Sequence, residues 1–344
     1  MCLLHGHKFN YSFLLPLTQG QYARLVPDSE ITSAKINTFI NITKTWKKLS
    51  QWLSPRQFES VKQQPCIQQF MHLDTLGWAG QIFHNIAMRL MSHRGMGDAL
   101  CFGLGAAVGR FSINEFCLIT SLNCVGSTLL PVVESQLITR YFSTLRGVSR
   151  ENLEVQMSNA KFDNDDDAVK LSLLYIMFSI PLSNASAVKI GPQFFALADD
   201  LDAFNSFPWG VLSWEATRAA ICHTVDNRMS SKKRPLKKNA IVHYSLPGFP
   251  HALLVWAYET IPSIATNFTT KYEPAIPRMT SWTTAENVKF NDVVAAFTTL
   301  GEDEVIFSFY LFYIFLFCIF LLCISIGGHQ HYDHPVLFVM TRWS

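Results

Sequence analysis

Apolar side chains recur every three or four residues along much of this sequence, which is the spacing of helices that bury one face. Residues 57–92 show this spacing, and residues 251–260 show it again. Strand-like patterns are short: one lies beside a glycine-rich stretch, and another at residues 240–244, where apolar and polar positions alternate. The pattern predicts a mainly α (α+β) protein, a helical globular domain with a few short strands.

One predicted helix carries its own start signal. Ser112 and Glu115 have the spacing of a capping box, and Phe111 and Phe116 occupy the flanking hydrophobic positions. We expect this helix to cover residues 113–123. It is the best-defined local element in the sequence.

Glycines stand at 103, 105 and 109, just before that helix. A phosphate-binding loop needs glycines that open the helix, so that free backbone N–H groups face the anion. Here the helix begins later, so we favour a tight turn between a strand and the helix over a nucleotide site.

Four aspartates precede an apolar run: Asp163, Asp165, Asp166 and Asp167. Spaced carboxylates bind calcium in EF-hand loops, but that template requires glycine where Ala168 stands and glutamate where Leu174 stands. Acidic residues also stabilise helix N-termini through the macrodipole. We therefore predict a helix start here.

A turn at residues 205–210 contains Phe207 and Trp209. Such a cluster can serve as an aromatic recognition surface, but it is more often a packed corner of the core. We expect the packed corner.

A basic segment follows, with no acidic residue among its members: Arg228, Lys232, Lys233, Arg234, Lys237 and Lys238. The pattern matches a nuclear localisation signal or nucleic-acid patch, and a solvated loop is the alternative. It is the best candidate contact surface that the sequence offers.

The composition of the chain excludes several classes of protein. The chain has 344 residues, a formal charge of +2 and 49% hydrophobic residues, which excludes a polybasic protein and global disorder. Its eight cysteines are scattered without a CxxC pair, so we expect buried free thiols and no zinc ribbon or disulfide scaffold. The N-terminal stretch is a poor signal peptide.

Residues 305–326 are hydrophobic at 20 of 22 positions, long enough to cross a bilayer as a helix. They contain no glycine or alanine, and nearly all their residues can be encoded by T-rich codons, as in a translated plant intron. A retained intron is our preferred interpretation, and a genuine membrane anchor is the alternative. Beyond it lie potential zinc or nickel ligands, His329, His331, Asp333 and His334, without a folded context that would orient them.

Five ordered motifs carry a family resemblance. They are RFSINEFCLITSLN (110–123), DDAVKLSLLY (166–175), DAFNSFPWG (202–210), GFPHALLVWAYETIP (248–262) and PRMTSW (277–282). The segment from about 60 to 285 resembles a plant-specific domain of unknown function, number nineteen eighty-five. That domain occurs beside ubiquitin-like (SUMO) protease domains of Mutator-like transposable elements. Ser121 replaces the family's usual glycine, which predicts a less sharp turn.

The resemblance implies no catalytic residues, and the protease domain is absent from this sequence. We therefore expect a non-catalytic interaction or positioning module without cofactor or metal, nuclear if the apolar tail is an artefact. The alternatives are a membrane-anchored protein held by 305–326 and, more weakly, a SUMO-type protease remnant. The sequence is compatible with three kinds of partner: another protein, nucleic acid at the basic segment, or a membrane at residues 305–326.

The expected parts of the chain follow from this interpretation. They are an N-terminal segment (1–59), the domain (60–285), a linker (286–304), the apolar segment (305–326) and a tail (327–344).

Overall fold

A computed structural model describes residues 14–16, 23–73, 76–92, 98–105, 107–143, 146–159, 161–231 and 242–298. The apolar segment 305–326, the histidine cluster and basic residues 232–238 lie outside the described residues. Within the described part, long helices and only short strands confirm the mainly α prediction. None of the helices described is long and apolar enough to span a membrane.

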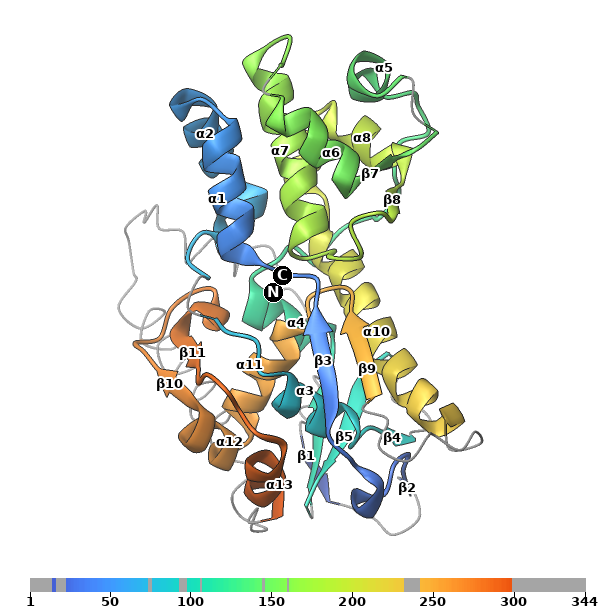
Figure 1. Ribbon diagram of the computed structural model, residues 1–344, viewed down its shortest axis with the longest axis vertical. Helices are drawn as coiled ribbons and strands as arrows, with labels where there is room; N and C mark the ends of the chain where they lie inside the picture. The colour runs from blue at the N-terminus through green and yellow to red at the C-terminus, as the bar shows by residue number, and fades with distance from the viewer. Residues whose placement is uncertain are drawn as a thin grey trace, which may run out of the picture. The chain divides into compact units, whose positions relative to one another are not determined.

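Helices make up more than half of the described residues (Figure 1). They are α1 (Ile42–Trp52), α2 (Pro55–Lys62), α3 (Gly80–Ala87), α4 (Ile113–Thr120), α5 (Gln136–Tyr141), α6 (Arg150–Ser158), α7 (Asp165–Ser179), α8 (Pro192–Ala198), α9 (Leu201–Ser206), α10 (Trp209–Ser231), α11 (His251–Thr260), α12 (Pro262–Phe268) and α13 (Phe290–Thr298). Three short 3-10 helices are η1 (Asp28–Glu30), η2 (Pro65–Phe70) and η3 (Arg278–Ser281).

The strands form small separate sheets. They are β1 (Leu14–Pro16), β2 (Ala23–Arg24), β3 (Ala34–Thr38), β4 (Met91–Ser92), β5 (Leu100–Leu104), β6 (Ala107–Phe111), β7 (Val148–Ser149), β8 (Lys189–Ile190), β9 (Val242–Leu246), β10 (Thr269–Lys271) and β11 (Trp282–Thr284). The order β1-β6-β5 makes an antiparallel three-stranded sheet, and β3 pairs in parallel with β9, Ile36 opposite Tyr244.

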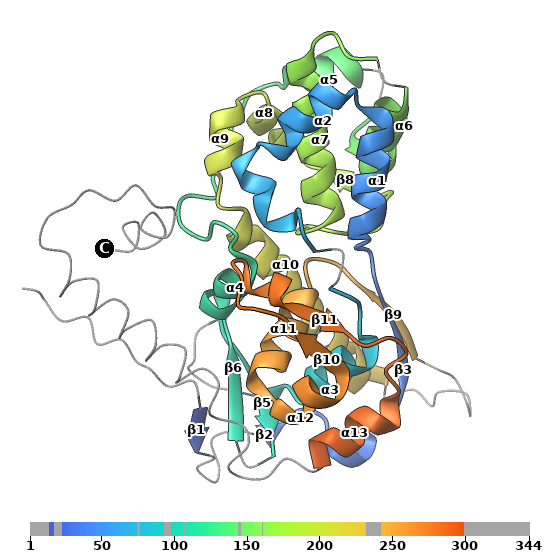
Figure 2. The same cartoon turned by 90° about the vertical axis from the view of Figure 1, so that its left-hand side faces the viewer.

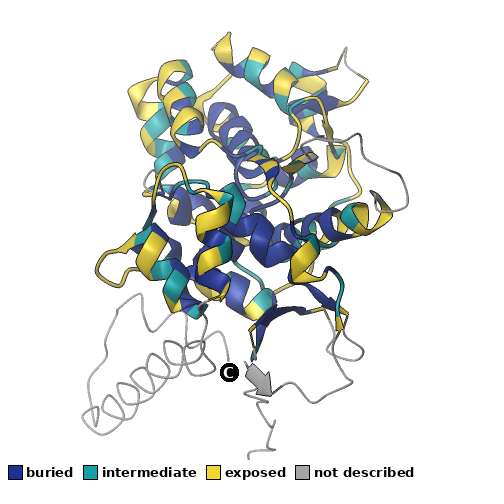
Figure 3. Cartoon of the chain, turned by 60° about the horizontal axis from the view of Figure 1, so that its bottom comes forward, coloured by how far each residue is buried: buried dark blue, intermediate teal, exposed yellow. Residues whose placement is uncertain are grey.

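The helices fall into two groups of neighbours (Figure 2). Helix α7 contacts α1, α2, α6 and α8, and α5 packs on α8. Helix α11 contacts α3, α4, α12 and β6, while α10 contacts α3, α4 and β9. One continuous hydrophobic core joins the two groups. Among the described helices α11 is the most buried, since all of residues 251–259 are buried. The buried residues, dark blue in Figure 3, gather in the interior of the domain.

Two predicted helix starts are confirmed by their cap hydrogen bonds. Ser112 N–H donates to Glu115 Oε2 at 2.6 Å, and the Phe111 and Phe116 rings lie 6.5 Å apart. The aspartate run begins α7, where Asn164 Oδ1 accepts from Asp167 N–H at 2.8 Å. These signals are local, so the sequence reveals them without knowledge of the fold.

Two sequence expectations are wrong in detail. Residues 57–92 are not continuously helical, because η2 and irregular chain separate α2 from α3. The glycines do not mark a strand-to-helix turn: Gly103 and Gly109 lie on the paired strands β5 and β6, and Gly105 adopts φ +62° in the turn between them. The ring of Trp256 requires a glycine at position 109, because a Cβ on Gly109 would lie 2.8 Å from that ring.

Ser121 ends α4 in the left-handed conformation, with φ 54° and ψ 21°. The expected less sharp turn is therefore wrong: serine makes the turn that glycine favours. A residue with a Cβ carries a penalty of about 1 kcal/mol in this conformation. We expect Ser121→Gly to raise the free energy of unfolding by about 1 kcal/mol.

Urea unfolding of both chains measures this gain. Ser158→Gly, which lies in the last turn of α6, is the matched control and should be destabilising. A loss of stability in Ser121→Gly would contradict the interpretation of the helix end.

Candidate interaction surface

Only one member of the basic segment lies among the described residues. Arg228, near the end of α10, donates from Nη2 to the Glu30 carbonyl oxygen at 2.8 Å and to Thr32 Oγ1 at 3.3 Å. It thereby ties α10 to the chain before β3. The five remaining members, Lys232, Lys233, Arg234, Lys237 and Lys238, lie outside the described residues, and their role stays a prediction.

Two carboxylates of the aspartate run form ion pairs and hydrogen bonds with other side chains of the domain. Asp167 is buried and pairs with Arg140, and it accepts a hydrogen bond from Tyr141 Oη at 2.8 Å. Asp165 accepts from Gln57 Nε2 at 2.9 Å. Across the described ranges no cluster of His, Cys, Asp and Glu is arranged to hold a metal ion.

The aromatic turn is a packed corner, as expected. Trp209 is buried at the start of α10, with its ring centroid 4.7 Å from that of Phe204 and 4.8 Å from that of Phe207. Its indole N–H donates to the Phe204 carbonyl oxygen at 2.9 Å. The same corner holds the beginning of a long connection between α4 and α5.

That connection is fixed at both ends. Asn123 Nδ2 donates to the Ser206 carbonyl oxygen at 2.8 Å, and its own carbonyl oxygen accepts from Gly210 N–H at 2.8 Å. At the other end, Asp199 accepts from the backbone N–H of Gln136 at 2.8 Å. Between these anchors lie residues 125–134, here called the apolar loop.

The apolar loop exposes large hydrophobic side chains. Leu129 is 87% exposed, Val132 95% and Val133 68%. Leu130 is partly buried and packs against the core, so it holds the middle of the loop on the domain. Clustered exposed hydrophobic residues of this kind mark interaction sites in soluble proteins.

A disulfide joins Cys117 on α4 to Cys124, directly before the apolar loop. The expectation of free thiols is wrong for this pair, because the turn at Ser121 brings α4 and Cys124 together. Cys66 and Cys101 are free and buried, as expected. Burial raises the pKa of Cys66 to about 12, so its thiol is protonated at pH 7.

The buried histidines are neutral at pH 7. Burial lowers the pKa of His251 to about 4, where its ring lies between those of Trp78 and Phe249. His84 also has a pKa of about 4, lowered chiefly by burial, and its ring nitrogens contact Tyr244 Oη and the Thr32 carbonyl oxygen. These contacts are those of core residues.

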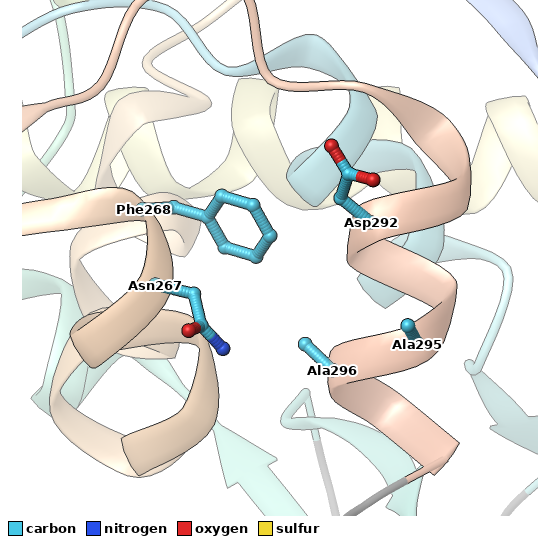
Figure 4. A pocket seen from close by; sticks show the side chains of 5 residues that line it. All are labelled: Asn267, Phe268, Asp292, Ala295 and Ala296. Atoms are coloured by element: carbon cyan, nitrogen blue, oxygen red, sulfur yellow. The ribbon is translucent and has the colours of Figure 1, made fainter.

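A shallow groove of about 350 Å³ lies between α12 and α13 (Figure 4). Asn267 and Phe268 line one side, and Asp292, Ala295 and Ala296 line the other. Asp292 is the single ionisable group among these residues, so the groove does not assemble an acid–base pair.

The family resemblance is confirmed in the middle of the chain. Residues 97–220 match the family model described as Domain of unknown function (DUF1985). The match includes β5, β6, α4, the apolar loop and the first half of α10. No curated protein and no solved structure matches the chain.

The apolar loop is not predicted as a surface by any sequence pattern. Its signal was present, since residues 125–134 combine five aliphatic residues with Gly126, Pro131 and a single charge, Glu134. Such a run is indistinguishable from a core segment when only the sequence is read.

Proposed function

We propose that this domain is a non-catalytic protein-binding module whose contact surface is the apolar loop. The supporting observation is the exposure of Leu129, Val132 and Val133 on a segment anchored at both ends. Covering a leucine or valine side chain stabilises a complex by about 2 kcal/mol. A preformed loop also loses less conformational entropy on binding than a free tail.

The resemblance suggests the setting of this module. We propose that it derives from a plant transposable element, works in the nucleus, and positions a partner for a ubiquitin-like (SUMO) protease domain encoded beside it. The basic segment 228–238 supports the nuclear location in this proposal.

Photo-crosslinking tests the proposed surface. The full chain carries a benzoylphenylalanine at Leu129 and is irradiated in plant nuclear extract. We expect a discrete adduct that excess wild-type chain competes away. The Val132→Asp chain should compete at least about tenfold less well, because a carboxylate would be buried against apolar surface.

Val155 supplies the matched control, since it is 61% exposed on α6, away from the loop in sequence. A Val155→Asp competitor should act like the wild type, and a photoprobe at Val155 should not give the same adduct. Equal competition by Val132→Asp and Val155→Asp would overturn the proposal.

The membrane-anchored protein is the second candidate, favoured by the 20 hydrophobic residues among the 22 at 305–326. Sequencing the plant transcript across codons 295–340 decides whether this stretch remains in the message. If it does, carbonate extraction of the expressed chain separates an integral membrane protein from a peripheral one.

A further inference from the structure

We propose that the Cys117–Cys124 disulfide is a thiol–disulfide switch, which fixes the start of the apolar loop when it is closed and loosens it when it is open. This switch rests on the proposed function and adds a means of regulating the same surface. Three features of the molecule carry it: the place of the disulfide, the exposure of its two cysteines and the packing of Cys124 against α10.

The disulfide closes a short ring of chain beside the apolar loop. Cys117 lies in the last turn of α4, and Cys124 directly precedes Val125, the first residue of the loop. Their Cα atoms are 6.4 Å apart, because Ser121 turns the chain back in its left-handed conformation. The covalent bond therefore joins the start of the loop to a helix of the core.

The other contacts at this end of the loop are noncovalent. A Cβ on Gly210 would collide with Cys124 Sγ, so the sulfur fills the space that this glycine leaves at the start of α10. The two hydrogen bonds of Asn123, to Ser206 and Gly210, hold the neighbouring residue on the same corner. When the disulfide opens, noncovalent contacts alone hold this end, and the first residues of the loop gain conformational freedom.

The cysteine pair lies at the surface of the domain. Both cysteines are half-buried, and they stand next in sequence to the exposed residues Leu118 and Val125. Cys66 and Cys101, by contrast, are buried. A soluble reductant or oxidant can therefore reach the pair, whereas the fold shields those two thiols.

The compartment gives the switch its direction. In the nucleus and cytosol thiols are kept reduced, and protein disulfides there are transient. In the proposed nuclear setting the pair is therefore open at rest and closes under oxidising conditions. Because the ordered loop is the form that binds, oxidation strengthens binding and reduction weakens it.

Both directions of the switch are thiol–disulfide exchange. In closing, one cysteine thiolate attacks glutathione disulfide and releases one glutathione thiol. The second cysteine attacks the resulting mixed disulfide and releases the other glutathione, so two electrons and two protons pass from the pair to the glutathione. In opening, a dithiol reductant gives two electrons and two protons to the pair and itself becomes a disulfide.

Tryptic mapping measures the state of the pair. Trypsin cleaves after Arg110 and Arg140, which leaves Cys117 and Cys124 on one peptide, 111–140, with no other cysteine. The folded full chain is incubated with glutathione disulfide or with excess reduced glutathione, then denatured, alkylated and digested. We expect this peptide without alkyl groups after oxidation and with two after reduction, reversibly over repeated cycles.

Elastase cleavage measures the order of the loop, because this protease cuts after small aliphatic residues such as Val132. We expect cleavage within residues 125–134 to be about fivefold faster in the open wild-type chain than in the closed one. Cys117→Ser should be cleaved at the open rate with or without glutathione disulfide. Cys222→Ser is the matched control, since Cys222 is a free, half-buried thiol on α10, and it should respond to oxidation like the wild type.

The crosslinking assay with the photoprobe at Leu129 measures the effect on binding. The closed wild-type chain should compete about tenfold better than the open one. Cys117→Ser should compete like the open chain in either condition. The main comparison uses one sequence in two redox states, so it does not depend on a variant that folds.

Equal cleavage or equal competition by the closed and open chains would overturn the switch, and so would a pair that fails to open or to close. In those cases loop-dependent crosslinking would still support the proposed function. If cleavage changes with the redox state but no crosslink depends on the loop, the proposed function is wrong and the redox control of loop order stands.

Discussion

Replacing Arg278 with methionine is expected to lower the free energy of unfolding by about 3 kcal/mol at pH 8. Arg278 donates from Nε to Glu259 Oε1 at 3.0 Å and from Nη2 to Oε2 at 2.6 Å. Glu259 is buried on α11, so methionine would leave a buried carboxylate without its main ionic partner. Removing one member of a buried pair costs far more than the intact pair contributes.

The loss should depend on pH. Burial raises the pKa of Glu259 even beside Arg278, and removing the guanidinium raises it further. The folded variant then binds a proton that the unfolded chain releases near pH 4.3. The contribution of Glu259 to the variant's stability is fully present below that pH and is lost as pH rises through the higher folded pKa, so Arg278→Met is closer to the wild type at pH 5 than at pH 8.

Urea unfolding at the two pH values measures this effect. Adding Glu259→Gln to Arg278→Met should recover part of the loss at pH 8 and remove its pH dependence. Arg56→Met is the matched control, because Arg56 pairs with Asp165 on the surface and should contribute less than about 1 kcal/mol. Equal losses in the Arg56 and Arg278 variants would contradict the prediction.

Gly248→Ala is expected to destabilise the fold by about 3 kcal/mol or more. Gly248 adopts φ +77° between β9 and α11, and a Cβ there would lie 2.7 Å from Thr217 N and 2.9 Å from Thr217 Cα. These are backbone atoms of α10, so the helix itself must move. The shift would also disturb the bonds of Gly248 to Ser183, in which Gly248 N–H donates at 2.9 Å and its carbonyl oxygen accepts at 2.7 Å.

Gly147→Ala separates the cost of the positive φ from the cost of the steric clash with Thr217. Gly147 also has a positive φ, +89°, but its nearest neighbour would be the flexible Lys189 side chain at 3.6 Å. We expect it to cost about 1 kcal/mol, the penalty for the backbone conformation alone. Thermal unfolding of both variants gives the comparison, and equal costs would show that the approach to Thr217 is unimportant.

The candidate surface could be predicted from the sequence only in part. The basic segment can be recognised in the sequence as a run of positive charges. The contacts of Arg228 with the chain before β3 could not be predicted from any sequence pattern. The apolar loop has the composition of a core segment, yet the folded chain leaves Leu129 and Val132 exposed. Exposure depends on what packs nearby, and that is set by residues distant in the chain.

The sequence by itself determined the mainly helical class, the starts of α4 and α7, and the resemblance confirmed at residues 97–220. Caps and helical periodicity act over a few residues, so they can be read locally. Tertiary structure alone decided the parallel pairing of β3 with β9, the hairpin at Gly105, the Cys117–Cys124 disulfide and the exposure of the apolar loop. The hairpin and the disulfide join residues close in sequence through the left-handed turns at Gly105 and Ser121, which no helical or strand periodicity predicts. The β3–β9 pairing and the exposure of the loop depend on residues far apart in the chain, and such contacts are not encoded in any short window of sequence.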